Sequence, residues 1–265
     1  MTYPQIDPVF FEVGPLQLRW YGLMYIIGFA CSYFVALDLV KRKGYDLTRR
    51  DVEDLLSFCI VGLIVGARLG YCLFYNFGFY LHNPVKILAV WEGGMSFHGG
   101  LIGLLLAGLI FAYRHRKPYL MLGDLGALAA TPGLFFGRMG NFINAELYGR
   151  VTDVPWAMVF PGGGPLPRHP SQLYEGFCEG ILLFALLYLL SRKESARGVL
   201  LSCFLTFYGS MRIFLEQFRE PDAQLGFLFG LFTMGQLLSS LMVAAGLALL
   251  ACALKSPGVF RDTLR

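Results

Sequence analysis

Long apolar runs separated by short charged connections make up most of the chain. Seven runs contain few or no charged residues, and they cover positions 20–37, 55–75, 95–113, 125–145, 173–190, 198–215 and 223–254. A membrane-spanning helix needs about 20 mostly apolar residues. The runs do not alternate with the period of two that a membrane strand requires. The pattern therefore predicts an all-α integral membrane protein, a single domain over residues 1–265 with seven transmembrane helices.

The charged connections predict how these helices are oriented. Of the 22 basic residues, 14 lie in the connections 41–50, 114–117 and 192–197 and at the C-terminal end. Because basic residues gather on the cytoplasmic side of a membrane, these connections are expected there. Seven spans then place the N-terminus outside and the C-terminus in the cytoplasm. Residues 1–14 contain no basic residue, so we expect no cleavable signal peptide and a retained first helix.

One external segment, residues 144–170, differs from the other connections. It contains five of the 13 prolines and three consecutive glycines at 162–164. Prolines fix φ and remove a backbone donor, so the segment cannot form a continuous helix. We expect a small periplasmic cap with a short strand at 155–161, and an ordinary surface loop is the alternative.

Composition agrees with a membrane protein and excludes several other classes. The chain is 56% hydrophobic and 15% charged, against roughly 25% charged in soluble domains. Twenty-four Phe and 14 Tyr exclude a disordered chain. The six cysteines have no spacing typical of disulfides or zinc. Cytoplasmic loops that face anionic lipid account for the net charge of +4, so no nucleic-acid partner is indicated.

Charged side chains inside the predicted helices point to a functional site. A charge at the bilayer centre costs about 2.5–3.5 kcal/mol, so such residues usually have a role. Counting along the helices places Arg68, Arg138 and Arg212 roughly 21–27 Å from the cytoplasmic connections. His98 and Tyr21 lie near the outer ends of their helices. Their convergence predicts a polar cavity that opens outward.

Spacing within the helices supports that cavity. Tyr208, Arg212 and Glu216 follow one another at intervals of four and share one helix face, as Arg138 and Asn141 do on another helix. Glycines surround Arg138 and His98, and small residues allow helices to approach closely or a ligand to reach the backbone.

Each of these residues also has a structural interpretation. Arg212 and Glu216 could neutralise each other, and Arg68 could extend to the lipid headgroups. His98 could be an interfacial histidine bonded to a carbonyl. Three acidic residues near helix ends are interpreted as solvated caps: Asp124, Glu175 and Glu179.

The residue types favour phosphate chemistry. Arginines at headgroup depth suit a phosphate, because the guanidinium matches its geometry and charge. A nearby histidine is a candidate general base. The sequence contains no HExxH, GxSxG or P-loop pattern, and His82, His115 and His169 are too far apart to form a metal site.

The block at 137–150, GRMGNFINAELYGR, resembles the signature of the bacterial phosphatidylglycerol–prolipoprotein diacylglyceryl transferase family. Further matching segments follow in family order and cover nearly the whole chain: 19–22, 66–70, 91–100, 169–175 and 208–220. The departure is Ala145, where glycine is usual in the family.

The resemblance implies an enzyme of the bacterial inner membrane whose site faces the periplasm. Such an enzyme transfers the diacylglyceryl group of phosphatidylglycerol to the lipobox cysteine of a preprolipoprotein signal peptide. It forms a thioether, releases glycerol 1-phosphate and needs no cofactor or metal.

The resemblance also assigns roles to residues. Arg138 and Arg212 would hold the phosphate, Glu216 would orient Arg212, and His98 would be the general base. Further substrate-binding residues would be Tyr21, Arg68, Asn141, Glu146, Gly149 and Tyr208. An anionic-lipid transporter or flippase is the alternative function, and a seven-helix receptor is a third.

Overall fold

The computed structural model describes residues 1–14, 16–220 and 233–255, and the chain divides into two compact units. The first unit consists of Met1–Gly44 and Gly123–Arg265, and the second of Tyr45–Leu122. The expectation of a single domain over residues 1–265 stays a prediction.

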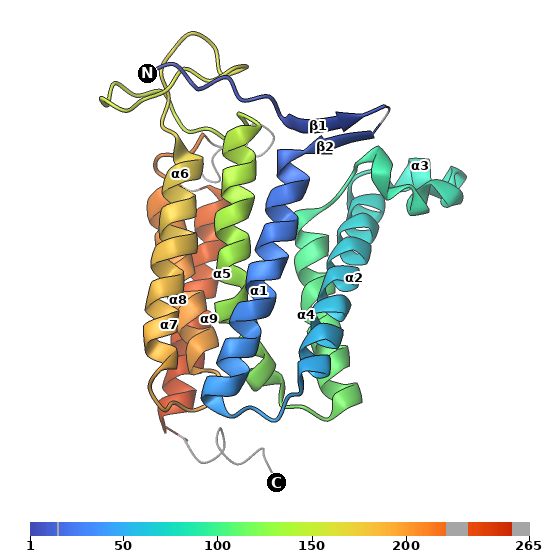
Figure 1. The fold of residues 1–265 in the computed structure, drawn as a ribbon, viewed down its shortest axis with the longest axis vertical. Helices are drawn as coiled ribbons and strands as arrows, with labels where there is room; N and C mark the ends of the chain where they lie inside the picture. Colours follow the sequence, from blue (N-terminus) through green and yellow to red (C-terminus); the bar gives the residue numbers. More distant parts are fainter. Residues whose placement is uncertain (15, 221–232, 256–265) are drawn as a thin grey trace. The chain divides into compact units, whose positions relative to one another are not determined.

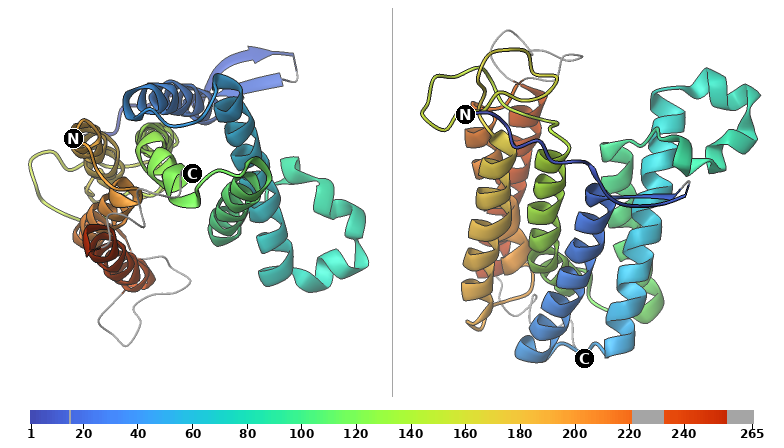
Figure 2. Two further views of the ribbon diagram at one scale, coloured as in Figure 1. Left: turned by 90° about the horizontal axis from the view of Figure 1, so that it is seen from below. Right: turned by 45° about the horizontal axis from the view of Figure 1, so that its top comes forward.

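The first unit is a bundle of long helices (Figures 1 and 2). Its helical elements are α1 (Trp20–Lys43), α5 (Tyr119–Ile143, whose first turn belongs to the second unit), α6 (Ser171–Glu175), the π-helical segment η3 (Gly176–Leu182), α7 (Leu183–Ser191), α8 (Val199–Leu215) and α9 (Met234–Lys255). The elements α6, η3 and α7 follow one another without a break and form one helix of 21 residues.

Glycines and one buried carboxylate bring these helices together. Gly28 of α1 packs on Gly133 of α5, where an added Cβ would lie 3.3 Å from the Gly133 Cα. Gly180 of η3 packs still more closely on Phe135, where an added Cβ would lie 2.6 Å from the Phe135 Cβ. At the start of α8, Asp124 accepts hydrogen bonds from the backbone nitrogens of Gly198 (2.7 Å) and Leu201 (2.8 Å). Asp124 is therefore a buried cap of a neighbouring helix, and the expectation of a solvated cap is wrong at this position.

The second unit is built around a pair of helices, α2 (Arg49–Phe74) and α4 (Phe97–His115). Three elements connect them: α3 (Phe77–His82) and the 3₁₀ helices η1 (Pro84–Leu88) and η2 (Val90–Glu92). Gly62, Gly66 and Gly70 of α2 face Gly99 and Gly103 of α4, and a Cβ at Gly66 would collide with the Gly99 carbonyl. The glycines after His98 therefore allow close helix packing.

Six of the described helices are long and apolar enough to cross a membrane, in agreement with an integral membrane protein. They are Trp20–Lys43, Arg49–Phe74, Phe97–His115, Tyr119–Ile143, Ser171–Ser191 and Met234–Lys255. The predicted run 198–215 is also helical, but α8 has only 17 residues. Within the predicted run 223–254, residues 223–232 lie outside the described part of the chain.

The sequence pattern missed a β-hairpin and predicted a strand that does not form. Strands β1 (Val9–Val13) and β2 (Leu16–Arg19) pair antiparallel just before α1. The expected strand at 155–161 is replaced by single bridges at Met158 and Val159. One bridge pairs Val159 with Thr2, because the N-terminal segment lies along this part of residues 144–170.

Candidate active site

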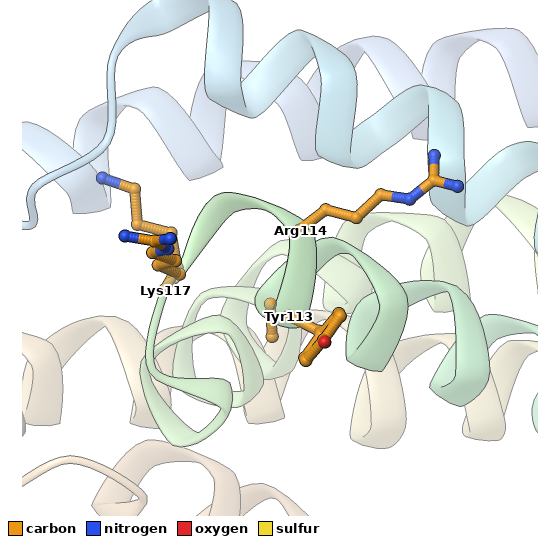
Figure 3. A pocket seen from close by; sticks show the side chains of 5 residues that line it. Tyr113, Arg114 and Lys117 are labelled. Carbon is orange, nitrogen blue, oxygen red and sulfur yellow. The ribbon is translucent and has the colours of Figure 1, made fainter.

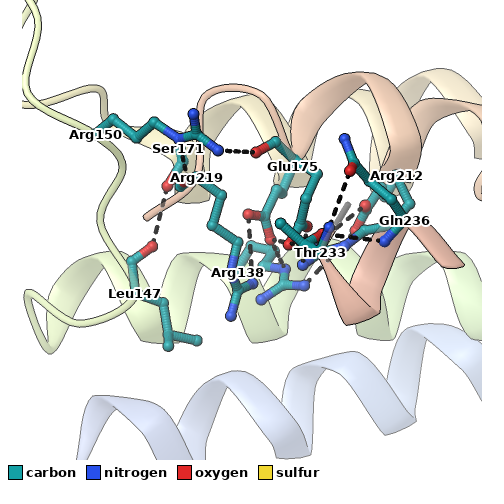
Figure 4. A network of polar contacts seen from close by, with 11 residues as sticks. Arg138, Leu147, Arg150, Ser171, Glu175, Arg212, Arg219, Thr233 and Gln236 are labelled. Atoms are coloured by element: carbon teal, nitrogen blue, oxygen red, sulfur yellow. Dashed lines mark hydrogen bonds and ion pairs between the residues drawn. The ribbon is translucent and has the colours of Figure 1, made fainter. Parts of the chain in front are cut away.

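A cluster of buried ion pairs lies in the first unit, where α5, α6, η3 and α8 meet (Figure 4). The carboxylate of Glu175 is at its centre. Oε2 lies 2.8 Å from Arg138 Nε and 3.3 Å from Arg212 Nη1, and Oε1 lies 3.7 Å from Arg219 Nη1. The predicted convergence of Arg138 and Arg212 is therefore present, and both arginines share one carboxylate.

Two further carboxylates complete the cluster. Glu179, on the π-helical segment, lies 3.8 Å from Arg138 and 3.9 Å from Arg212. Glu216 lies 2.7 Å from Arg212 Nη2 and accepts a hydrogen bond from Thr233 (3.1 Å). The carboxyl group of Glu216 packs closely on Gly235. A Cβ added to Gly235 would lie only 3.0 Å from the carboxyl carbon of Glu216. The predicted pairing of Arg212 with Glu216 is confirmed.

The roles expected for Glu175 and Glu179 from the sequence are wrong. The sequence pattern predicts solvated caps, yet the side chains of Glu175 and Glu179 are only 2% and 0% exposed. Arg138 has no acidic neighbour within a helical turn, but two carboxylates from another helix pair with it. Their spacing of four, which puts both carboxylates on one helix face, was the sequence signal that could have identified them.

Three of the family-like segments are joined near this cluster by hydrogen bonds from side chains to backbone carbonyls. Gln172 donates to the carbonyl of Glu146 (2.6 Å), and Ser171 donates to that of Leu147 (3.0 Å). Arg150 Nε donates to the carbonyl of Arg219 (2.8 Å). The block at 137–150 therefore ties the start of α6 to the segment that carries Arg219.

Gly149 makes one of these contacts possible. It forms a β-bridge with Arg219, and a Cβ at this position would collide with the Phe218 carbonyl and lie 2.8 Å from His169 Cβ. Only glycine fits there without a shift. The structure thus gives Gly149 a packing role, whereas its predicted contact with substrate stays a prediction.

Three other predicted site residues, Asn141, Glu146 and Tyr21, lie near the end of α5, whereas Tyr208 belongs to α8. Asn141 donates to Glu146 Oε1 (2.8 Å), so these two side chains hold each other. The ring of Tyr21 packs against Gly140, where a Cβ would lie 2.8 Å from the ring, and its hydroxyl lies 3.2 Å from that of Tyr25. Tyr208, one turn before Arg212, stacks on Phe204 at 5.5 Å.

The turn after α5 gives a physical reason why glycine is favoured at position 145. Ala145 has φ = 54°, a left-handed conformation that glycine adopts without strain and alanine does not. Glycine at this position would therefore suit the backbone better.

Arg68 and His98 belong to the second unit. Arg68 is 3% exposed, so the expectation that it extends to headgroups is wrong. Its Nε and both terminal nitrogens donate to five backbone carbonyls, those of Lys86, Ile87, Ala89, Gly93 and Gly94. His98 lies in the first turn of α4, where its imidazole is exposed and packs edge-on against Phe97 (5.7 Å).

Two other features lie outside the ion-pair cluster. His169, in the predicted cap, has its Nδ1 3.2 Å from the Tyr174 hydroxyl, and burial lowers the pKa of this histidine below its usual value. A surface hollow of about 510 Å³ lies at the end of α4 in the second unit (Figure 3). It is lined by Ala112, Tyr113, Arg114, Arg116 and Lys117.

Helices of membrane-spanning length and a buried arginine–glutamate cluster define a multi-pass membrane protein with a polar site in its helix bundle. Comparison with known proteins identifies its family. The family model for prolipoprotein diacylglyceryl transferases matches residues 8–252. The chain belongs to this family.

Several relatives named phosphatidylglycerol–prolipoprotein diacylglyceryl transferase match over nearly their full length. The protein from Geobacter sulfurreducens is 55% identical over 94% of this chain and 96% of its own. Those from Vibrio vulnificus and Oleidesulfovibrio alaskensis are 51% and 50% identical over 99% and 97% of this chain and 96% of their own.

Proposed function

We propose that this chain transfers the diacylglyceryl group of phosphatidylglycerol to the lipobox cysteine of preprolipoproteins. The observation that carries the proposal is the buried cluster in which Arg138 and Arg212 share Glu175, in a chain with relatives of that name. Two guanidinium groups side by side suit the phosphate of an anionic lipid.

The proposed reaction exchanges a C–O bond of the lipid for a C–S bond and transfers the thiol proton to a base. The cysteine thiol loses its proton to a base, because the thiolate is the nucleophile. The thiolate attacks the terminal glyceryl carbon, a C–S bond forms, and the C–O bond to phosphate breaks. Glycerol 1-phosphate leaves as a monoester with more negative charge than the diester. Arginines fixed beside it stabilise the developing charge more strongly than the ground state.

Each predicted site residue has a place in this proposal except Arg68. Arg138 and Arg212 bind the phosphate, Glu216 orients Arg212, and His98 is the general base. Substrate-binding roles are assigned to Tyr21, Asn141, Glu146, Gly149 and Tyr208. Arg68 is excluded because its N–H donors are already bound to carbonyls of its own unit. We propose no metal or cofactor.

The proposed topology has seven spans: the six long apolar helices and the shorter helix α8. Its 17 residues extend about 26 Å, slightly less than a typical hydrocarbon core. The bias of the basic connections supports an N-terminus outside and a C-terminus in the cytoplasm of the bacterial inner membrane. Arg138, Arg212 and the segment 144–170, proposed as a cap, then lie toward the periplasmic side.

The test is transfer by the purified protein. The protein is incubated with phosphatidylglycerol vesicles and a lipobox peptide, and the peptide is analysed by mass spectrometry. We expect a diacylglyceryl mass increment, none on a peptide with serine in place of the cysteine, and release of glycerol 1-phosphate. Lipid movement between leaflets without this increment would support the transporter alternative, and binding without turnover would support a receptor.

A further inference from the structure

Within the ion-pair cluster, the arginine side chains are more exposed than the carboxylates. The side chains of Arg138, Arg212 and Arg219 are 18%, 13% and 13% exposed, whereas those of Glu175 and Glu179 are 2% and 0% exposed. The arginine side chains are therefore more accessible to a ligand than Glu175 and Glu179.

One arginine of the cluster retains a donor that forms no hydrogen bond. Nη1 of Arg212 is buried without a hydrogen-bond acceptor in the described structure, although Glu175 lies 3.3 Å away. Glu179 lies beyond 3.5 Å from both arginines, and neither of its oxygens accepts a hydrogen bond there. Charge attraction thus holds much of this cluster, and an unpaired buried donor gains considerably from an anionic acceptor.

Glu175 is the residue that relates the arginines to one another. Three guanidinium groups at this depth repel each other strongly, because the surroundings screen charge poorly. One carboxylate that contacts all three offsets this repulsion and sets the separation of Arg138 from Arg212. Catalysis by fixed charges requires such groups to be in place before the transition state forms.

We propose that Glu175 is a positioning residue for diacylglyceryl transfer, with Glu179 in a weaker supporting role. Glu175 holds Arg138 and Arg212 from the buried side, and the phosphate of the lipid binds on their opposite, exposed side. This inference rests on the proposed function. Neither carboxylate touches the substrate, so both act through the arginines.

The test compares steady-state transfer by Glu175→Gln and the wild type, with phosphatidylglycerol and lipobox peptide varied separately. The amide keeps the shape but loses the charge, and its NH₂ group faces a guanidinium donor. We expect kcat/KM for phosphatidylglycerol to fall about 100-fold, with a raised KM for this lipid and an unchanged KM for the peptide. A purely structural role would lower kcat with the folded fraction and leave both KM values unchanged, which would overturn the proposal.

Two further variants keep the test decisive if Glu175→Gln does not fold. Glu175→Asp retains the charge but retracts it by one methylene, so it should restore part of the lost lipid affinity. Glu179→Gln removes the carboxylate with the longer contacts and should reduce kcat/KM about tenfold, less than Glu175→Gln. Wild-type KM for the lipid in both variants, or a larger loss for Glu179→Gln, would overturn the proposal.

Asp124→Asn is the matched control. Asp124 is also a buried carboxylate of the first unit, but it caps α8 about 21 Å along α5 from Arg138. This variant should be less stable and keep both KM values. Absence of product from the wild type would contradict the proposed function itself, whereas an active wild type with an equally active Glu175→Gln would overturn only the role of Glu175.

Discussion

The two units bury arginine side chains against different partners: backbone carbonyls in the second unit and carboxylates in the first. Arg68 donates to five backbone carbonyls that belong to the connection between α2 and α4. Arg138 and Arg212 instead contact carboxylates, and Arg212 Nη1 lacks a hydrogen-bond acceptor in the described structure. Carbonyls saturate the donors of Arg68 in fixed directions. Carboxylates balance the charge of the other two, and Arg212 keeps one donor that forms no hydrogen bond.

The largest expected effect on transfer is that of a substitution at Arg138. Arg138→Ala should reduce thioether formation at least about 1,000-fold, because it removes a fixed positive charge from the departing phosphate. Mass spectrometry of the lipobox peptide measures the rate, and membrane insertion should remain intact. Full product formation by this variant would show that Arg138, like Arg68, is not needed for transfer.

Arg68→Ala should act mainly on stability. It leaves buried carbonyls without donors, so we expect the free energy of unfolding to fall by about 3 kcal/mol. Denaturant titration in detergent measures this loss. Transfer per folded molecule should stay within about twofold of the wild type, because the side chain has no donor left for substrate. Lost transfer at unchanged stability would instead place Arg68 among the substrate-binding residues.

His98→Gln tests whether the second unit contributes to the chemistry. If His98 is the base, transfer should fall about 100-fold, because glutamine cannot accept the thiol proton. The pH profile is measured on purified wild type and variant. A rate near that of the wild type at all pH values would show that His98 is not the base.

Ala145→Gly should have the smallest effect and the opposite sign. Relief of a left-handed alanine is worth about 1–2 kcal/mol, partly offset by the extra freedom of glycine in the unfolded chain. We expect a gain of up to about 1 kcal/mol in unfolding experiments, with unchanged transfer. Ala130→Gly, on an exposed helical position of α5, is the control and should lose about 1 kcal/mol.

Much of the fold could be predicted because long helices follow from local hydrophobicity. All seven apolar runs contain helices in the described structure, although the expected strand at 155–161 does not form. The hairpin before α1 and the elements α3, η1 and η2 were missed. These short elements depend on particular turns and contacts, such as the carbonyls that Arg68 binds, and leave little periodic signal.

The site could be predicted only in part. Arg138, Arg212 and Glu216 could be identified, because a charge within an apolar run is energetically costly and usually marks a functional site. Glu175 and Glu179 were misread, because their positions near the start of a run suggested exposure to solvent. The packing of η3 on Phe135, through Gly180, is what buries this helix against α5.

The sequence by itself determined the class of protein, its helices and which embedded charges needed an explanation. These properties depend on the chemistry of neighbouring residues and on motif spacing. Only the tertiary structure decided that Glu175 lies between three arginines and that Arg68 is satisfied by carbonyls. Ion pairs between helices join residues far apart in the chain, and the free energy of a buried charge depends on what surrounds it in space.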